Sequence, residues 1–147
     1  MLHILLAEDN LGDVLLVQRA LEVHHVVHKL HVVRDGAEAL SFVAQMGQSA
    51  ETPVPDVVLM DLNLPKMDGP EILAELRKHP ECAHTPIVVI TSSDAQKDRA
   101  RSAELGVSRY FKKPSDLDAF MQLGALVREV AGVPAGTSGQ ITKELDS

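Results

Sequence analysis

Short apolar runs alternate with longer segments of helical period along most of this chain. Three of the runs are almost wholly apolar, as expected for parallel strands that are buried on both faces. The runs are Ile4–Ala7, Leu30–Val33, Val57–Met60, Ile87–Ile90 and Arg109–Phe111. Five strand–helix alternations in about 130 residues predict right-handed crossovers and an α/β fold with a doubly wound, five-stranded parallel sheet.

The segments between the runs begin with residues that commonly cap helices. The candidate capping residues are Asn10, Asp35, Asp68, Ser93 and Ser115. The first predicted helix spans Leu11–Val23, and the last spans residues 116 to about 130. Residues 1–130 are therefore expected to form one domain. Glycines and prolines break any helix after Ala131, so residues 131–147 are predicted to be a tail too short for a second domain.

The composition excludes several functional classes. A formal net charge of −7 provides no overall basic surface for nucleic acid. No apolar run approaches the ~18 residues of a membrane span, and the N-terminal run stops at Glu8 without a basic region before it, unlike a signal peptide. The single cysteine, Cys82, cannot form an internal disulfide, which suits a reducing compartment. We expect a cytoplasmic protein that binds neither nucleic acid nor membrane.

Polar residues follow the predicted strands at the point where each strand ends. They are Glu8 and Asp9 after the first run, Asp61 after the third, Thr91 and Ser92 after the fourth, and Lys112 and Lys113 after the fifth. Ligands of open α/β sheets bind beyond the carboxyl ends of the strands. These carboxylates, hydroxyls and ammonium groups are therefore expected to converge on one rim of the sheet.

A cluster of carboxylates at this rim favours phosphoryl-transfer chemistry. Clustered carboxylates repel one another unless a cation neutralises them, and hard oxygen ligands suit Mg²⁺. Asp61 is placed to attack a phosphoryl group that the metal polarises. Lys113 would pair with a phosphoryl oxygen as a point charge, and Thr91 could donate a hydrogen bond to another. An aspartate after a strand is by itself commonly a loop residue, so the prediction depends on the whole ordered set.

The same residues resemble the receiver domain of two-component response regulators over about residues 2–130. The resemblance is carried by Leu5-Leu6-Ala7-Glu8-Asp9-Asn10, by the run from Leu59 through Met60-Asp61-Leu62-Asn63-Leu64-Pro65-Lys66-Met67 to Asp68-Gly69, by Ile90-Thr91-Ser92-Ser93 and by Tyr110-Phe111-Lys112-Lys113-Pro114. It implies a flavodoxin-like (βα)5 fold with strand order 2-1-3-4-5. It also implies a single-domain regulator without an output domain, one that catalyses only its own phosphoryl transfer and dephosphorylation and is otherwise not an enzyme.

The resemblance assigns a role to each rim residue. Asp61 resembles the phospho-acceptor that receives its group from a phosphohistidine on a sensor histidine kinase in a phosphorelay. The implied Mg²⁺ ligands are Glu8, Asp9, Asp61 and the backbone carbonyl of Asn63. Thr91 and Lys113 resemble the phosphate contacts, Thr91 and Tyr110 the switch pair, and Pro114 a position where the family often has a cis peptide.

Further features are similar to one group of stand-alone receivers, those that pair with bacterial phytochrome kinases. These features are Glu8-Asp9-Asn10 followed by Gly12-Asp13, a long loop at 47–56 and Thr91-Ser92-Ser93. A phytochrome-type kinase is therefore an expected partner.

The last predicted helix carries apolar residues on two sides. One stripe, which should face the sheet, is Leu117, Phe120, Met121, Gly124 and Val127; the second, nearly opposite, is Ala119, Leu123, Leu126 and Val130. A helix that only covers a sheet needs one apolar face. The second stripe predicts a homodimer through residues 115–130 and the neighbouring surface.

Two other functional classes remain open. A magnesium-dependent phosphatase of the haloacid dehalogenase type also forms an aspartyl phosphate, but it needs Asp-x-Asp after its first strand, whereas Asp61-Leu62-Asn63 follows the third. An interaction module with a receiver fold and no phosphorylation would not need Asp61 together with Thr91 and Lys113. A metal site among the neighbouring histidines at 24, 25, 28 and 31 and a nucleophilic role for Cys82 are both disfavoured, because the histidines do not share one face and Cys82 has no clear general base.

Overall fold

The computed structural model describes residues 1–62, 68–92 and 106–133. Its elements are β1 (Leu2–Ala7), α1 (Leu11–Val23), β2 (His28–Val33), α2 (Gly36–Gln45), β3 (Val57–Asp61), α3 (Gly69–Arg77), the 3₁₀ turn η1 (Pro80–Cys82), β4 (Ile87–Thr91), β5 (Arg109–Lys112), α5 (Leu117–Phe120) and α6 (Gln122–Val130). The predictions for Asn63, for a helix capped by Ser93 and for most of the tail lie outside the described residues.

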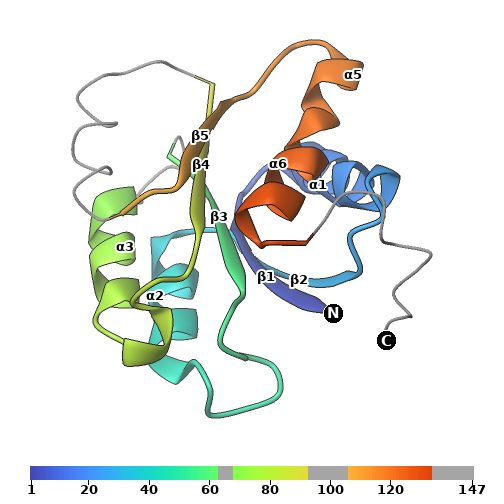
Figure 1. The fold of residues 1–147 in the computed structure, drawn as a ribbon. Coiled ribbons are helices and arrows are strands. Elements are labelled where there is room, and N and C mark those ends of the chain that lie inside the picture. The colour runs from blue at the N-terminus through green and yellow to red at the C-terminus, as the bar shows by residue number, and fades with distance from the viewer. Residues whose placement is uncertain (63–67, 93–105, 134–147) are drawn as a thin grey trace, which may run out of the picture.

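The five strands form one parallel sheet in the order β2-β1-β3-β4-β5. Helices α2 and α3 cover one face of this sheet, and α1, α5 and α6 cover the other (Figure 1). The doubly wound α/β fold predicted from the apolar runs is confirmed. The chain reverses direction across the sheet between β1 and β3, and such a reversal opens a crevice at the carboxyl ends of these strands.

The central strands β3 and β4 are buried at every position, and β1 is buried from Ile4 to Ala7, which explains their nearly continuous apolar runs. In β1, Leu5 and Ala7 pack into the core on the side of α2 and α3, whereas Ile4 and Leu6 pack into the core on the side of α1 and α6. Side chains alternate between the faces of a strand, so a strand with two covered faces has no solvent-facing position for a polar residue. In β3 and β4 the first polar residues, Asp61 and Thr91, come where the strand ends.

Side-chain caps begin the helices where the sequence predicted them. The amide of Asp13 donates to Asn10 Oδ1 at 3.0 Å, and the amide of Glu38 donates to Asp35 Oδ1 at 2.8 Å. Asp68 caps α3 in the same way. The prediction that Ser115 caps the last helix is wrong. Asp116 accepts the cap hydrogen bond instead, and its carboxylate also interacts favourably with the positive end of the helix dipole.

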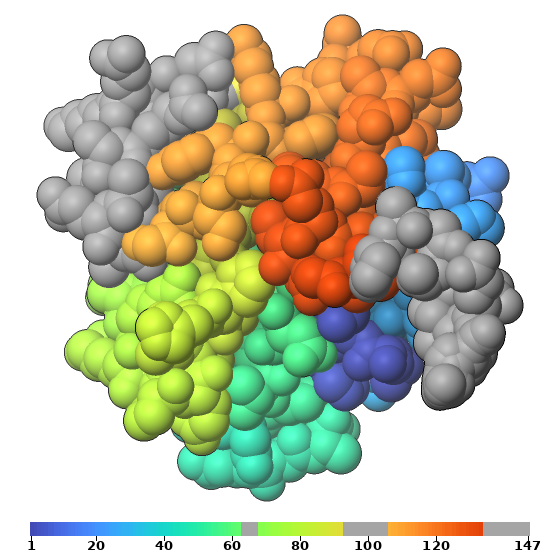
Figure 2. Space-filling view, viewed as in Figure 1, coloured from blue at the N-terminus to red at the C-terminus, as the bar shows by residue number. Residues whose placement is uncertain are grey.

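The last helical segment has the predicted bounds, but its two apolar stripes are not placed as predicted. Met121 divides the segment into α5 and α6, although its own backbone angles, φ −62° and ψ −19°, are those of a right-handed helix. Leu123 is fully buried, whereas Leu117 is 57% exposed. The reason is that α6 packs against α1 as well as against the sheet, and Figure 2 shows the surface of α6 beside that of α1. A helix with two neighbours needs a wide apolar arc, so Leu123 of the second stripe belongs to the core, whereas Leu126 and Val130 are partly buried.

A side-chain hydrogen bond ties α6 to the end of α1. The buried Arg128 guanidinium donates from Nη1 to the carbonyl of His24 at 2.5 Å. Carbonyls at the end of a helix lack intrahelical donors, so an arginine there satisfies one of them. Among the described residues, no helix has both the length and the apolar character needed to cross a bilayer.

Candidate functional site at the carboxyl edge of the sheet

Three chain segments bring charged side chains together at the carboxyl edge of the sheet. Glu8 follows β1, Asp61 is the last residue of β3, and Lys113 follows β5. Backbone hydrogen bonds extend the sheet just past its strands: the Glu8 amide donates to the Val33 carbonyl, and the Lys113 amide donates to the Thr91 carbonyl. These bonds fix the main chain from which the charged side chains extend.

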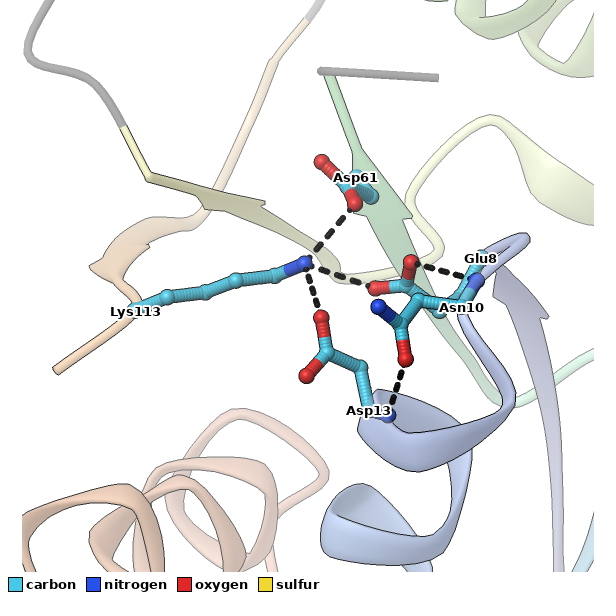
Figure 3. A network of polar contacts seen from close by, with 5 residues as sticks. All are labelled: Glu8, Asn10, Asp13, Asp61 and Lys113. Atoms are coloured by element: carbon cyan, nitrogen blue, oxygen red, sulfur yellow. Dashed lines mark hydrogen bonds and ion pairs between the residues drawn. The ribbon is translucent and has the colours of Figure 1, made fainter. Parts of the chain in front are cut away.

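The ammonium of Lys113 lies at the centre of a carboxylate cluster (Figure 3). Its Nζ donates to Glu8 Oε1 at 2.9 Å, to Asp13 Oδ2 at 2.8 Å and to Asp61 Oδ2 at 2.9 Å. An ammonium has three N–H donors, so these carboxylates use all of them. The Glu8 and Asp61 side chains are only 2% and 4% exposed, whereas the Asp13 side chain is 25% exposed at the outer edge of the cluster.

The buried carboxylates and the ammonium shift each other's pKa values. Burial raises the pKa of Glu8 to about 7, and the nearby Asp61 charge adds to this, while hydrogen bonds from Lys113 and the Asn10 amide oppose it. Burial alone would lower the pKa of Lys113, but its hydrogen bonds to Asp13, Asp61 and Glu8 outweigh burial, and the net pKa is raised. Lys113 therefore stays charged at neutral pH, and the site attracts further positive charge.

The donor set at this edge fits Mg²⁺. In residues 1–62, 68–92 and 106–133, no group of three or more histidine, cysteine, aspartate or glutamate side chains is arranged to hold a metal ion. Mg²⁺ does not require such a cage, because it keeps several waters and binds through one or two carboxylates plus phosphate oxygens. Glu8 and Asp61 are two buried carboxylates whose oxygens could bind such an ion, with Asp9 adjacent in sequence.

Comparison with known proteins identifies the family. The model of the response regulator receiver domain matches residues 4–124. This chain is a response regulator receiver domain. It thus belongs to the signalling proteins of two-component systems.

The receiver is similar to several cyanobacterial regulators. It is 42% identical to the response regulator Rcp1 of Synechocystis sp. over 114 residues, which are 78% of each chain. The crystal structure of the phosphorylated cyanobacterial phytochrome response regulator RcpA matches with a TM-score of 0.75 and 39% identity, covering 87% of this chain and 91% of that one. The Mn²⁺-bound form of Rcp1 also matches with a TM-score of 0.75, at 37% identity over 88% and 93% of the two chains.

The receiver brings together only part of the predicted site. Glu8, Asp61 and Lys113 meet directly, and Thr91 ends β4 with 6% of its surface exposed. Asp9 is exposed beside Glu8. Tyr110 is half-buried in β5 and packs against the core on the α2–α3 side. The peptide between Lys113 and Pro114 is trans, contrary to the family expectation, and trans is the favoured isomer for most prolines.

One charged residue of the receiver's site was missed from the sequence. Asp13 was named from the sequence only as part of the likeness to receivers that pair with phytochrome kinases, yet its carboxylate makes the shortest of the Lys113 contacts. The sequence did contain a pattern that points to Asp13. The first helix begins directly after the polar residues that follow β1, so its first turn must lie at the same edge of the sheet. Acidic residues in its first turn are therefore candidates for the site.

Local contacts account for His31 and for Cys82. His31 pairs with His3 on the neighbouring strand, with 3.1 Å between their ring nitrogens. Cys82 is fully buried, and burial raises the pKa of its thiol. A buried thiol with a raised pKa is a poor nucleophile.

Replacing Lys113 by Met tests how much the ammonium stabilises the cluster of three carboxylates. The variant is expected to lose about 2 kcal/mol of stability without metal, because Glu8, Asp13 and Asp61 keep their mutual repulsion and lose their shared counter-charge. Mg²⁺ should restore part of this loss. Thermal unfolding in EDTA and in Mg²⁺ measures both effects.

The matched control is Lys29→Met, which removes an exposed strand lysine outside the cluster and should change stability by less than about 0.5 kcal/mol. If the Lys113 variant were as stable as the wild type in EDTA and gained no more from Mg²⁺, the ammonium would not be what balances these carboxylates.

Proposed function

We propose that this receiver accepts a phosphoryl group on Asp61 from the phosphohistidine of a sensor histidine kinase, in a reaction that requires a bound divalent cation. The observation that carries the proposal is the 2.9 Å contact between Lys113 Nζ and Asp61 Oδ2. It places a positive charge beside a buried carboxylate at the carboxyl edge of the sheet. Phosphoryl transfer depends mainly on such positioning and charge compensation.

The proposed reaction assigns a task to each residue. An Asp61 carboxylate oxygen attacks phosphorus; the new O–P bond forms as the P–N bond to the donor imidazole breaks, and the imidazole leaves with the bonding electrons. Lys113 compensates charge on a phosphoryl oxygen, and Thr91 donates its hydroxyl to another. Mg²⁺, held by Glu8, Asp9, Asp61 and the Asn63 carbonyl, would neutralise charge as the phosphoryl group arrives.

A surface change is proposed to follow phosphorylation. The phosphoryl group adds roughly −1.5 to −2 charges next to Thr91 and offers it a new acceptor. Thr91 then moves inward and the ring of Tyr110 turns behind it. Tyr110 pairs in register with Val89 of β4, so the ring lies on the strand next to the one that Thr91 ends. A local change of charge at Asp61 thus selects between two conformations of the surface around Thr91 and Tyr110.

We further propose that the kinase partner is of the phytochrome type. The support is similarity to RcpA, a cyanobacterial phytochrome response regulator, and to a bacteriophytochrome response regulator at 35% identity over 91% of this chain. Phosphoryl transfer from a phytochrome kinase expressed from the same genome would test this proposal.

A homodimer through residues 115–130 stays a prediction. Leu123, on which it was based, is buried, and Leu117 is the large apolar side chain of α5 that remains exposed. Sedimentation velocity at micromolar concentration, with and without beryllium fluoride, is expected to give a dimer; a monomer in both conditions would contradict the prediction.

Labelling with a small phosphodonor tests the function itself. Acetyl phosphate with Mg²⁺ is expected to add one phosphoryl group, seen by intact-mass spectrometry, and EDTA should prevent it. Steady turnover of many phosphate monoesters would instead favour a phosphatase. No covalent gain and no response to beryllium fluoride would favour an interaction module that is not phosphorylated.

A further inference from the structure

We propose that Asp13 is a positioning residue, one that holds the Lys113 ammonium over Asp61 before and after phosphorylation. This inference rests on the proposed function, because it assigns Lys113 its task in phosphoryl transfer. It concerns a carboxylate that lies outside the acidic pair and the acceptor.

The contact between Asp13 and Lys113 is as close as the contacts that Lys113 makes with Glu8 and Asp61. Asp13 Oδ2 lies 2.8 Å from Lys113 Nζ, although the two residues are 100 positions apart in the chain. The Asp13 carboxylate is not needed to cap its helix, because Asn10 Oδ1 already accepts the amide of Asp13 itself. Figure 3 shows the Asp13 side chain directed away from the helix toward the ammonium.

The three carboxylates around Lys113 differ in what the reaction does to them. Asp61 loses its charge when it becomes an acyl phosphate, and Glu8 is among the ligands expected to turn toward the metal or its waters. Asp13, at the outer edge of the cluster, has neither task. It is therefore the acceptor that stays with Lys113 while the other two change, and a phosphoryl oxygen takes the place that Asp61 Oδ2 holds in this structure.

Holding the ammonium from the outer side has two physical consequences. A lysine side chain has four rotatable bonds, and a fixed charged partner removes freedom that would otherwise be lost when the phosphoryl group arrives. The same partner also draws the ammonium outward, which weakens its competition with Mg²⁺ for Glu8 and Asp61. Asp13 should thus increase both the rate of phosphoryl transfer and the affinity for Mg²⁺.

The test compares Asp13→Asn, which keeps the shape of the side chain, with Asp13→Glu, which keeps its charge. At saturating Mg²⁺, Asp13→Asn should acquire the phosphoryl group from acetyl phosphate about tenfold more slowly, because the ammonium exchanges a carboxylate acceptor for a neutral amide oxygen and loses an ion pair. Asp13→Glu should recover most of the rate. Calorimetric titration with Mg²⁺ alone, without phosphodonor, should show several-fold weaker binding in Asp13→Asn and near-normal binding in Asp13→Glu.

The matched control is Asp118→Asn, which removes an exposed carboxylate from the first turn of α5 and should leave the rate and the Mg²⁺ affinity unchanged. If Asp13→Asn matched the wild type in both measurements while Asp61→Asn stayed unlabelled, the inference would be wrong and the proposed function would stand. A faster rate in Asp13→Asn would also overturn it, because the carboxylate would then repel the phosphoryl group. If the wild type were not labelled at all, the proposed function would fail. The Mg²⁺ titration would still test whether Asp13 draws the Lys113 ammonium away from Glu8 and Asp61, because Asp13→Asn would then bind Mg²⁺ more weakly than the wild type.

Discussion

Replacing Asp61 by Asn is expected to lower phosphoryl labelling by acetyl phosphate and Mg²⁺ by more than about 100-fold. The amide oxygen of asparagine carries no full negative charge and cannot form a stable acyl phosphate. Asn nevertheless fits the same space at the end of β3, where the Asp61 side chain is only 4% exposed. Intact-mass spectrometry after a fixed incubation gives the labelled fraction.

The Asp61 variant should remain folded. Asp61 is one of the charges that raise the pKa of Glu8, so its removal relieves repulsion between buried carboxylates. Melting temperatures in EDTA are therefore expected to be equal to or above that of the wild type. Asp118→Asn, with its exposed carboxylate, serves again as the control and should be labelled normally. Labelling that persisted in Asp61→Asn would place the nucleophile elsewhere.

Replacing Gly124 by Ala is expected to destabilise the protein by about 3 kcal/mol. A Cβ at this position would lie 2.1 Å from the carbonyl oxygen of Ala20 and 2.7 Å from Cδ2 of His24. Backbone of a neighbouring helix cannot rotate away as a flexible side chain can, so α6 would have to move off α1. That movement would loosen the packing of the buried Leu123 and Val127.

Two opposing effects decide the size of this loss. Alanine is favoured over glycine inside a helix by about 1 kcal/mol, which offsets only part of the steric cost. Urea unfolding followed by circular dichroism measures the difference. Gly12→Ala is the matched control, because its Cβ would meet only the side chain of Asn10, at 3.1 Å, and the change should stay within about 1 kcal/mol. If the Gly124→Ala variant were as stable as the wild type, α6 could move away from α1 without lowering the free energy of unfolding, and the predicted clash would have no energetic cost.

Local chemistry made the strands and most helix caps predictable. A parallel strand between two helical layers must be apolar on both faces, and Ile4–Ala7 and Ile87–Ile90 meet that requirement in the sequence alone. Asn10 and Asp35 cap helices through hydrogen bonds to amides three residues away. Interactions of such short range do not depend on the rest of the fold. The ends of the strands could therefore be placed, and Glu8 and Asp61 with them.

The tertiary structure alone decided two other features. The stripe containing Leu123 was predicted to meet a second copy of the chain, because the sequence does not say how many neighbours a helix has. The close packing of α6 on α1 instead buries Leu123 inside the monomer. The contact between Asp13 and Lys113 depends on where the start of α1 lies relative to the end of β5, elements separated by most of the chain. Sequence patterns thus determined the strands and the charged residues at their ends. The docking of α1 against the sheet and α6 determined which carboxylates share the ammonium, because that geometry arises only when distant segments pack together.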